Sequence, residues 1–314
     1  MANWLVLAEQ VLGGHELTDE EALAILDCPD EELLLLLQGA YRIRSAYYGN
    51  KVKLNMIINA KSGLCPENCG YCSQSAVSTA PVKTYKMVDK ETLLRGAEEA
   101  HRLRIGTYCI VASGRGPSDK EIDTVVSAVK EIKERFGLKV CACLGILKPE
   151  QAARLKEAGV DRYNHNINTS KQHHPNITTS HTYDDRVRTV ETVKEAGLSP
   201  CSGVIIGMKE TKQDVVDMAR SLRALDADSI PVNVFACDRR HAAGWHERIK
   251  PALLFEGAGP FSLYESNQRN PHRRRARSEF ALTSAAWPVC RQLDFCRRLF
   301  DDRRARKVSR LSNA

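Results

Sequence analysis

Residues 61–75, KSGLCPENCGYCSQS, contain three cysteines in a Cys-x3-Cys-x2-Cys spacing: Cys65, Cys69 and Cys72. Three thiolates on one short loop can hold one corner of an iron-sulfur cubane, and the glycines in this stretch permit tight turns. The loop offers no fourth cysteine, so a four-iron cluster bound here would keep one iron open to a further ligand. Structural zinc usually takes four protein ligands. Zinc, or cysteines without a role, are therefore the less favoured alternatives.

The cysteine loop directly follows an apolar run, and the same rhythm continues along the chain. Six short apolar runs typical of strands alternate with five amphipathic segments typical of helices. This alternation predicts a parallel sheet with right-handed helical crossovers. The expected strands are 52–60, 107–113, 139–146, 162–168, 199–207 and 229–235, and the expected helices are 89–103, 118–136, 148–158, 182–197 and 211–225.

Polar and thiol side chains within these strands distinguish two α/β folds that both fit the rhythm. The strands of a doubly wound sheet are covered on both faces and are mostly hydrophobic, whereas a barrel can place polar residues around a cofactor in its interior. The sequence therefore predicts a (β/α) TIM-type barrel. The residues that favour it are Asn55, Cys109, Cys141, Asn164, Asn166, Cys201 and Asn233.

The chain divides into three segments by pattern. Residues 1–50 read as a helical lead-in, in which Thr18 is an expected N-cap followed by acidic residues. Residues 51–235 contain the barrel pattern, and residues 236–314 form an arginine-rich tail without clear strand-helix alternation.

Composition and segment patterns bound the location and the use of the cysteines. The chain has 314 residues and 11 cysteines. It shows no apolar stretch long enough to span a membrane and no secretory signal pattern at its start, so we expect a cytoplasmic protein that does not act at a membrane. Cytosolic thiols stay reduced, which favours ligation over a disulfide framework.

The net charge of +7 is concentrated in the tail. From Cys237 onward there are 15 Arg and 2 Lys against 8 acidic residues, so the residues before that point are slightly acidic. The barrel segment therefore gives no indication of a nucleic-acid partner.

The cysteine spacing after the first strand resembles the signature of the radical S-adenosylmethionine superfamily, with Tyr71 at the aromatic position before the last cysteine. Segments from about Leu17 to Phe235 are similar, in order, to the biotin synthases, including YCIVASGRGPSDKE, VCACLGILKPEQAARLKEAGVDRYNHNINTS and HTYDDRVRTVETVKEAGLSPCSGVIIGM. The resemblance implies a 4Fe-4S cluster on Cys65, Cys69 and Cys72. It also implies S-adenosylmethionine at the open iron, and insertion of sulfur into dethiobiotin by a 5'-deoxyadenosyl radical.

The same resemblance implies further ligands and partners. A 2Fe-2S cluster that donates the sulfur would be held by Cys109, Cys141 and Cys201, together with an arginine. Asn164, Asn166 and Asn233 would bind substrate or cofactor, and Arg186 the S-adenosylmethionine carboxylate. An electron donor such as flavodoxin or ferredoxin and a homodimer are also implied.

Each of these residues also has a plainer interpretation. Lone cysteines in apolar strands are often buried hydrophobes, the asparagines could form a polar network, and Arg186 could be a solvated helix charge. Cys143 shares a strand face with Cys141 and is expected to pack, while His165 is expected on the outer face and Cys28 outside the barrel. His173 to Pro175 are expected in a loop. Lys209 stands where the family typically has a glycine, so the local turn is expected to be perturbed.

The tail departs from the family. The two closing strands and the motif that supplies the arginine ligand are missing after Phe235, and none of Arg239, Arg240, Arg273, Arg274 or Arg275 can be assigned to that ligand. A nucleic-acid-binding extension is one explanation. Arg-rich, Lys-poor sequence is also what a GC-rich gene gives when read out of frame, and our hypothesis is a frameshift shortly after Asn233. The alternatives to a biotin synthase are therefore an inactive frameshifted homologue or another radical enzyme.

Overall fold

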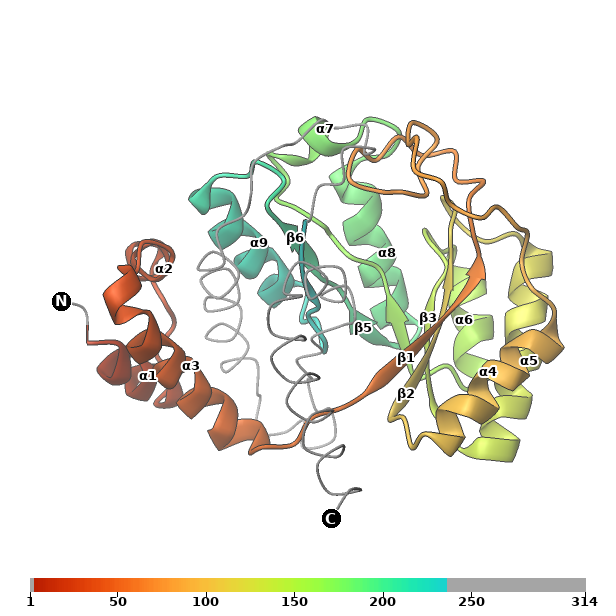
Figure 1. The fold of residues 1–314 in the computed structure, drawn as a ribbon, viewed down its shortest axis with the longest axis horizontal. Helices are drawn as coiled ribbons and strands as arrows, with labels where there is room; N and C mark the ends of the chain where they lie inside the picture. The colour runs from red at the N-terminus through yellow and green to blue at the C-terminus, as the bar shows by residue number, and fades with distance from the viewer. Residues whose placement is uncertain (1–2, 236–314) are drawn as a thin grey trace, which may run out of the picture.

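The computed structural model describes residues 3–235, and the arginine-rich tail with its frameshift hypothesis lies outside the described residues. Figure 1 shows an arc in which helices lie on the outside and strands on the inside, with the N-terminal helices at one end. Within this part of the chain no helix is both long enough and apolar enough to cross a bilayer.

The N-terminal helices are α1 (Trp4–Leu12), α2 (Asp19–Leu26) and α3 (Leu33–Tyr48), with the short 3-10 turn η1 (Asp30–Glu32) between the last two. Helix α2 begins with the expected cap, because Thr18 and Glu21 bond each other's backbone N–H groups in a capping box. The buried residues of these helices, and Cys28 in the connection after α2, share one hydrophobic cluster with β6 and α9. The lead-in is therefore packed onto one end of the arc.

Five parallel strands form the first sheet, in chain order: β1 (Asn55–Lys61), β2 (Thr107–Ala112), β3 (Lys139–Cys143), β4 (Arg162–Asn164) and β5 (Ser199–Cys201). Two further parallel strands, β6 (Val204–Ile206) and β7 (Val232–Val234), pair with each other. Isolated bridges from Asn168 to Val204 and from Cys201 to Ser229 join the two sheets. The strands together form one curved parallel wall.

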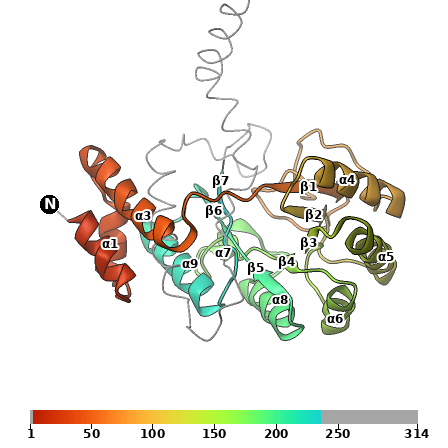
Figure 2. The same cartoon turned by 90° about the horizontal axis from the view of Figure 1, so that it is seen from below.

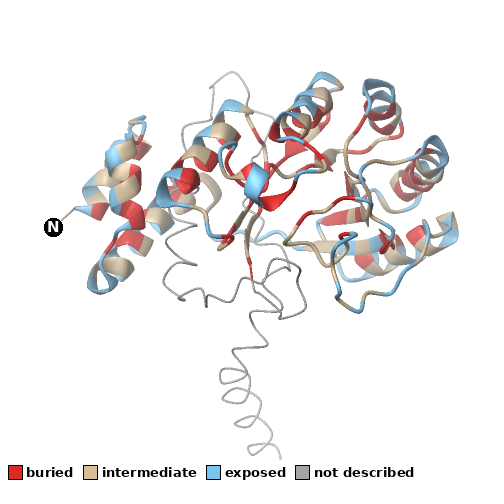
Figure 3. Ribbon diagram, turned by 90° about the horizontal axis from the view of Figure 1, so that it is seen from above, coloured by how far each residue is buried: buried red, intermediate tan, exposed pale blue. Residues whose placement is uncertain are grey.

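The outer layer consists of α4 (Lys90–Arg102), α5 (Asp119–Phe136), α6 (Pro149–Glu157), α8 (Tyr183–Glu195) and α9 (Lys212–Ala224). Figure 2 shows these helices outside the strands, and Figure 3 shows their buried residues facing inward. Tyr108, Ile110 and Val140 from the strands pack against this layer in the second hydrophobic cluster. The other face of the wall is left to polar and thiol side chains, as the barrel prediction requires.

The expected helices and the strand order are confirmed, with two differences. The run 199–207 does not form one strand: β5 ends at Cys201, and the chain resumes as β6 beside β7. Gly203 lies at the break, where a Cβ atom would stand 2.0 Å from the carbonyl oxygen of Pro231. The loop expected at His173 to Pro175 is instead the start of a short helix, α7 (His174–Ile177), in which Pro175 occupies a first-turn position.

Candidate functional site

The cysteine loop lies at the carboxyl end of β1 and lines a cavity of about 310 Å³. Cys69 is buried and Cys65 and Cys72 are half-buried, and the Cys72 backbone N–H donates to the Cys69 carbonyl at 3.2 Å. Burial, followed by neighbouring thiols, raises the pKa of Cys65 and Cys72 above that of a free thiol, and the Glu67 carboxylate adds to the effect on Cys65. A bound metal would displace these protons.

The donor set fits an iron-sulfur cluster. Within residues 3–235 no three His, Cys, Asp or Glu side chains converge on a point that could hold a single metal ion. Cluster cysteines bind separate iron atoms, so they need to surround a cavity rather than meet at one position. The three thiols on the rim of the first cavity satisfy this requirement.

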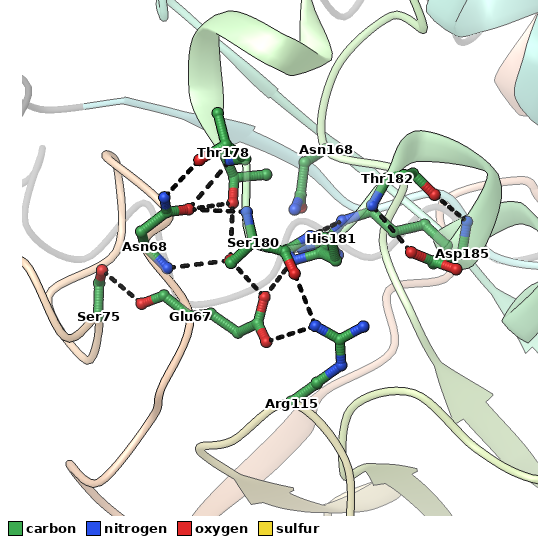
Figure 4. A network of polar contacts seen from close by, with 12 residues as sticks. Glu67, Asn68, Ser75, Arg115, Asn168, Thr178, Ser180, His181, Thr182 and Asp185 are labelled. Atoms are coloured by element: carbon green, nitrogen blue, oxygen red, sulfur yellow. Dashed lines mark hydrogen bonds and ion pairs between the residues drawn. The ribbon is translucent and has the colours of Figure 1, made fainter.

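A buried hydrogen-bond network ties the cysteine loop to the segment before α8, as Figure 4 shows. Glu67, between two of the loop cysteines, accepts a hydrogen bond from the Ser180 hydroxyl at 2.5 Å and one from His181 Nδ1, and it pairs with Arg115 at 3.2 Å. Asn68 Oδ1 accepts from the Thr178 hydroxyl at 2.7 Å. The position of the loop is therefore set by contacts about a hundred residues away in the sequence.

Arg186 continues this network into the cavity. Its Nε donates to His181 Nε2 at 2.9 Å, and its terminal nitrogen donates to the Asn166 carbonyl at 3.0 Å. His181 thus accepts at Nε2 and donates at Nδ1, which defines its neutral tautomer, and burial followed by the Arg186 charge lowers its pKa. Arg186 is buried and lines the first cavity, so the interpretation as a solvated helix charge is wrong.

Asn168 and Tyr71 complete one wall of the first cavity. With the Asn168 amide oxygen turned toward its donors, it accepts from the Tyr71 hydroxyl at 2.5 Å and from both terminal nitrogens of Arg186 at 3.1 and 3.2 Å. Asn168 has φ of 68°, a left-handed conformation that Asn tolerates better than most residues. The sequence signal for Asn168 was its place at the end of the RYNHNIN run.

A second cavity, of about 410 Å³, lies closer than the first to the amino ends of the strands. It is lined by the thiols of Cys109, Cys141 and Cys201. Cys109 and Cys141 are register partners in β2 and β3, and Cys201 is opposite Asn164 in β4. The hydrogen bond from the Cys141 thiol lowers the pKa of Cys109 and raises that of Cys141. Cys109 is therefore the thiol of this pair that loses its proton more readily.

The predicted asparagines divide between the two cavities. Asn164 and Asn166 line both, and the Asn164 side-chain amide donates to the Cys201 sulfur at 3.1 Å. Asn233 lines only the second cavity, where its amide donates to the Val204 carbonyl at 3.4 Å. The three asparagines that the sequence placed inside the barrel therefore face its interior.

Three other residues also line the cavities, and two of them do so for reasons that the sequence pattern did not show. His165 was expected on the outer face, but it is buried and lines the first cavity, because β4 ends at Asn164 and strict alternation ends with it. Cys143 shares the Cys141 face as expected and borders both cavities. Arg162 lines the second cavity, and nothing but its place two residues before Asn164 signalled this.

Comparisons with known proteins match this arrangement. A model of the radical SAM superfamily matches residues 61–222, which is half of the chain. The chain is 96% identical to the biotin synthase of Geobacillus kaustophilus over 266 residues, which cover 83% of this chain and 80% of that protein. It is 74% identical to the biotin synthase of Bacillus subtilis over 233 residues, which cover 74% and 70%.

The chain belongs to the biotin synthase family. The family resemblance inferred from the cysteine loop and the strand motifs is thereby confirmed, as is the enzyme class. In this family the Cys-x3-Cys-x2-Cys loop is the radical SAM signature that the superfamily model covers.

Solved structures support the fold of this chain. Methylornithine synthase superposes with a TM-score of 0.75 at 18% identity, covering 83% of this chain and 77% of that one. The FeFe-hydrogenase maturase HydG of Carboxydothermus hydrogenoformans gives a TM-score of 0.71 at 15% identity, covering 88% and 70%. At these identities the likeness concerns the fold, and it confirms the radical SAM type of (β/α) barrel.

Proposed function

We propose that this chain is built to insert sulfur into dethiobiotin with two iron-sulfur clusters and S-adenosylmethionine. The observation that supports this is the adjacency of two separate sets of three thiols inside one barrel wall. Val111, Cys143, Asn164 and Asn166 line both cavities, so a molecule between the two sites would touch the same side chains. The extra set of strand thiols is what favours this proposal over another radical enzyme.

In the first cavity, Cys65, Cys69 and Cys72 would hold a 4Fe-4S cluster with one iron open to S-adenosylmethionine. Bound there, S-adenosylmethionine supplies a radical that abstracts hydrogen from unactivated carbon. Arg186 places a buried positive charge at the first cavity, which suits a carboxylate, and Asn168 holds that guanidinium in orientation. The buried wall around these groups would keep water from the reactive species.

In the second cavity, Cys109, Cys141 and Cys201 would hold the 2Fe-2S cluster that donates sulfur. Dethiobiotin carries a ureido ring, and the neutral amides of Asn164, Asn166 and Asn233 offer it donors and acceptors without a competing charge. The reaction needs an external reductant, such as flavodoxin or ferredoxin. A homodimer and a cytoplasmic location belong to the same proposal.

The segment assignment belongs to the proposal as well. Residues 1–50 would be the helical lead-in, 51–235 the barrel, and 236–314 an atypical tail. The change to arginine-rich sequence after Phe235 favours a second candidate, an inactive frameshifted homologue. Sequencing the gene downstream of the Asn233 codon separates the two explanations for the tail, because an uninterrupted reading frame would contradict the frameshift.

Anaerobic reconstitution of the full chain with iron and sulfide tests the proposed chemistry. We expect two cluster types by Mössbauer spectroscopy and 5'-deoxyadenosine on reduction with S-adenosylmethionine. Changing Cys65, Cys69 and Cys72 to alanine should remove the 4Fe-4S signal, while Cys28→Ala, outside the barrel, should not. Clusters without S-adenosylmethionine cleavage would favour the inactive homologue. Iron retained at the first site by the triple variant would contradict the proposal.

A further inference from the structure

Arg162, the first residue of β4, lines the second cavity together with the three strand thiols. It is the register partner of Cys141 in β3, so the two side chains stand next to each other on the interior face. On its other side Arg162 pairs with Ser199 in β5, and its Nε donates to the Ser199 hydroxyl at 3.4 Å. The Ser199 hydroxyl in β5 therefore binds the guanidinium, and Cys141 in β3 is its register neighbour on the other side.

The charges in this cavity do not balance without Arg162. Three thiolates bring one more negative charge than the two positive charges of an oxidised 2Fe-2S core can neutralise. An uncompensated charge in a buried site is costly. A guanidinium stays protonated at any physiological pH, so Arg162 supplies the missing positive charge permanently.

The only other cation among the described residues that line this cavity is Lys53. Lys53 is exposed and lies on the segment before β1, so water and salt screen its charge. Arg162 is half-buried within the sheet. The interior position makes Arg162 the stronger electrostatic neighbour of the thiols.

We propose that Arg162 is a positioning residue for the second cluster, whose charge it compensates so that the three strand thiolates retain it. This inference rests on the proposed function, because it presumes a cluster on Cys109, Cys141 and Cys201. It assigns Arg162 an electrostatic role and no bond to iron. Since reduction adds a further negative charge, the same guanidinium makes the cluster easier to reduce.

Three variants of the full chain, reconstituted anaerobically beside the unaltered protein, test this role. Arg162→Met removes the charge with little change of volume, Arg162→Lys keeps it, and Lys53→Met removes the other cation of the same cavity. The 2Fe-2S and 4Fe-4S contents are measured separately by Mössbauer spectroscopy, and the reduction potential of the 2Fe-2S cluster by titration followed by EPR. Circular dichroism and the 4Fe-4S content report whether each variant folds.

We expect Arg162→Met to keep the 4Fe-4S cluster but to lose roughly half or more of the 2Fe-2S cluster, with a more negative potential for the remainder. The variants Arg162→Lys and Lys53→Met should retain most of the 2Fe-2S cluster. Should Arg162→Met not fold, the comparison of Arg162→Lys with Arg162→Gln decides instead. Equal 2Fe-2S content and equal reduction potential in the charged and uncharged variants would overturn this inference but leave the proposed function standing. Absence of the 2Fe-2S cluster from the unaltered chain would contradict the proposed function and this inference together.

Discussion

Glu67 is the residue through which the cysteine loop is anchored. Burial alone would raise its pKa, but the hydrogen bonds from Ser180 and His181 and the nearby Arg115 outweigh this and lower it, so the carboxylate is ionised at neutral pH. Its charge in turn keeps a proton on His181 Nδ1, which leaves Nε2 free to accept from Arg186. One carboxylate thereby orients both the loop and the cavity arginine.

Glu67→Gln is expected to weaken S-adenosylmethionine binding. The amide keeps the size of the side chain but places an N–H group among hydrogen-bond donors. This costs about 1–3 kcal/mol, which corresponds to a rise of roughly fivefold to a hundredfold in KM for S-adenosylmethionine. The measurement is KM and kcat for 5'-deoxyadenosine formation in reconstituted protein. The control is Glu191→Gln, on the exposed face of α8, the helix that carries Arg186. An unchanged KM would show that the network does not position Arg186.

Lys209 was expected to perturb its local turn, and its φ is 69°. A side chain in the left-handed region is strained, whereas glycine adopts it freely. We expect Lys209→Gly to raise the free energy of unfolding by about 0.5–1 kcal/mol, measured by chemical denaturation. Lys83→Gly, at an exposed non-helical position without positive φ, should give no such gain. A loss of stability in Lys209→Gly would mean that the lysine side chain stabilises this turn.

At the scale of elements, the break between β5 and β6 depends on Gly203. Its N–H donates to the Asn166 side chain at 3.0 Å, and its carbonyl accepts from the Asn168 N–H at 3.0 Å. The Pro231 carbonyl approaches the Gly203 backbone closely where β6 and β7 begin to pair, and it accepts from the Val204 N–H at 3.0 Å.

Gly203→Ala should therefore destabilise the barrel by about 2 kcal/mol or more, because a methyl group would overlap the Pro231 carbonyl and force the strands apart. Thermal unfolding of the reconstituted protein measures this. Gly106→Ala is the matched control, since its Cβ would lie 3.4 Å from the Leu54 carbonyl, an ordinary contact. Equal melting temperatures for the two variants would contradict the close approach.

The helices were the most predictable elements, because capping and amphipathic spacing are local signals. Helix α5 was expected at 118–136 and spans Asp119–Phe136, with Ser118 and Glu121 forming a capping box and Gly137 ending it in a left-handed conformation. The strand at 199–207 was less predictable. Its split results from the approach of Pro231, about thirty residues away, which no local pattern reports.

At the scale of the whole molecule, several buried histidines make the folded state sensitive to acid. Burial, followed by the charge of Arg186, lowers the pKa of His165, His174 and His181, and that of His174 falls to about 4. The unfolded chain, with an ordinary histidine pKa near ~6.5, binds more protons than the folded chain between these values. Stability should therefore fall as the pH drops from about 6.5 toward 4.

His174→Phe tests this pH dependence. Its ring packs edge-on against His181 at 5.4 Å and Tyr183 at 6.0 Å between centroids, contacts that a phenylalanine ring can keep. We expect the loss in unfolding free energy between pH 7 and 5 to shrink by about 1–2 kcal/mol in this variant. The exposed His101→Phe should leave it unchanged. An unaltered slope in His174→Phe would mean that His174 titrates normally in the folded protein.

Local periodicity, spacing and motifs were enough to predict the order of strands and helices, the family and the two groups of cysteines. The sequence also indicated that Asn164, Asn166 and Asn233 face inward. Which side chains lie together became visible only in the folded protein: Arg162 with the strand thiols, and Glu67 and His181 with Arg186. These contacts depend on strand register and on segments about a hundred residues apart, and such distances are settled by packing of the whole barrel rather than by any stretch of sequence.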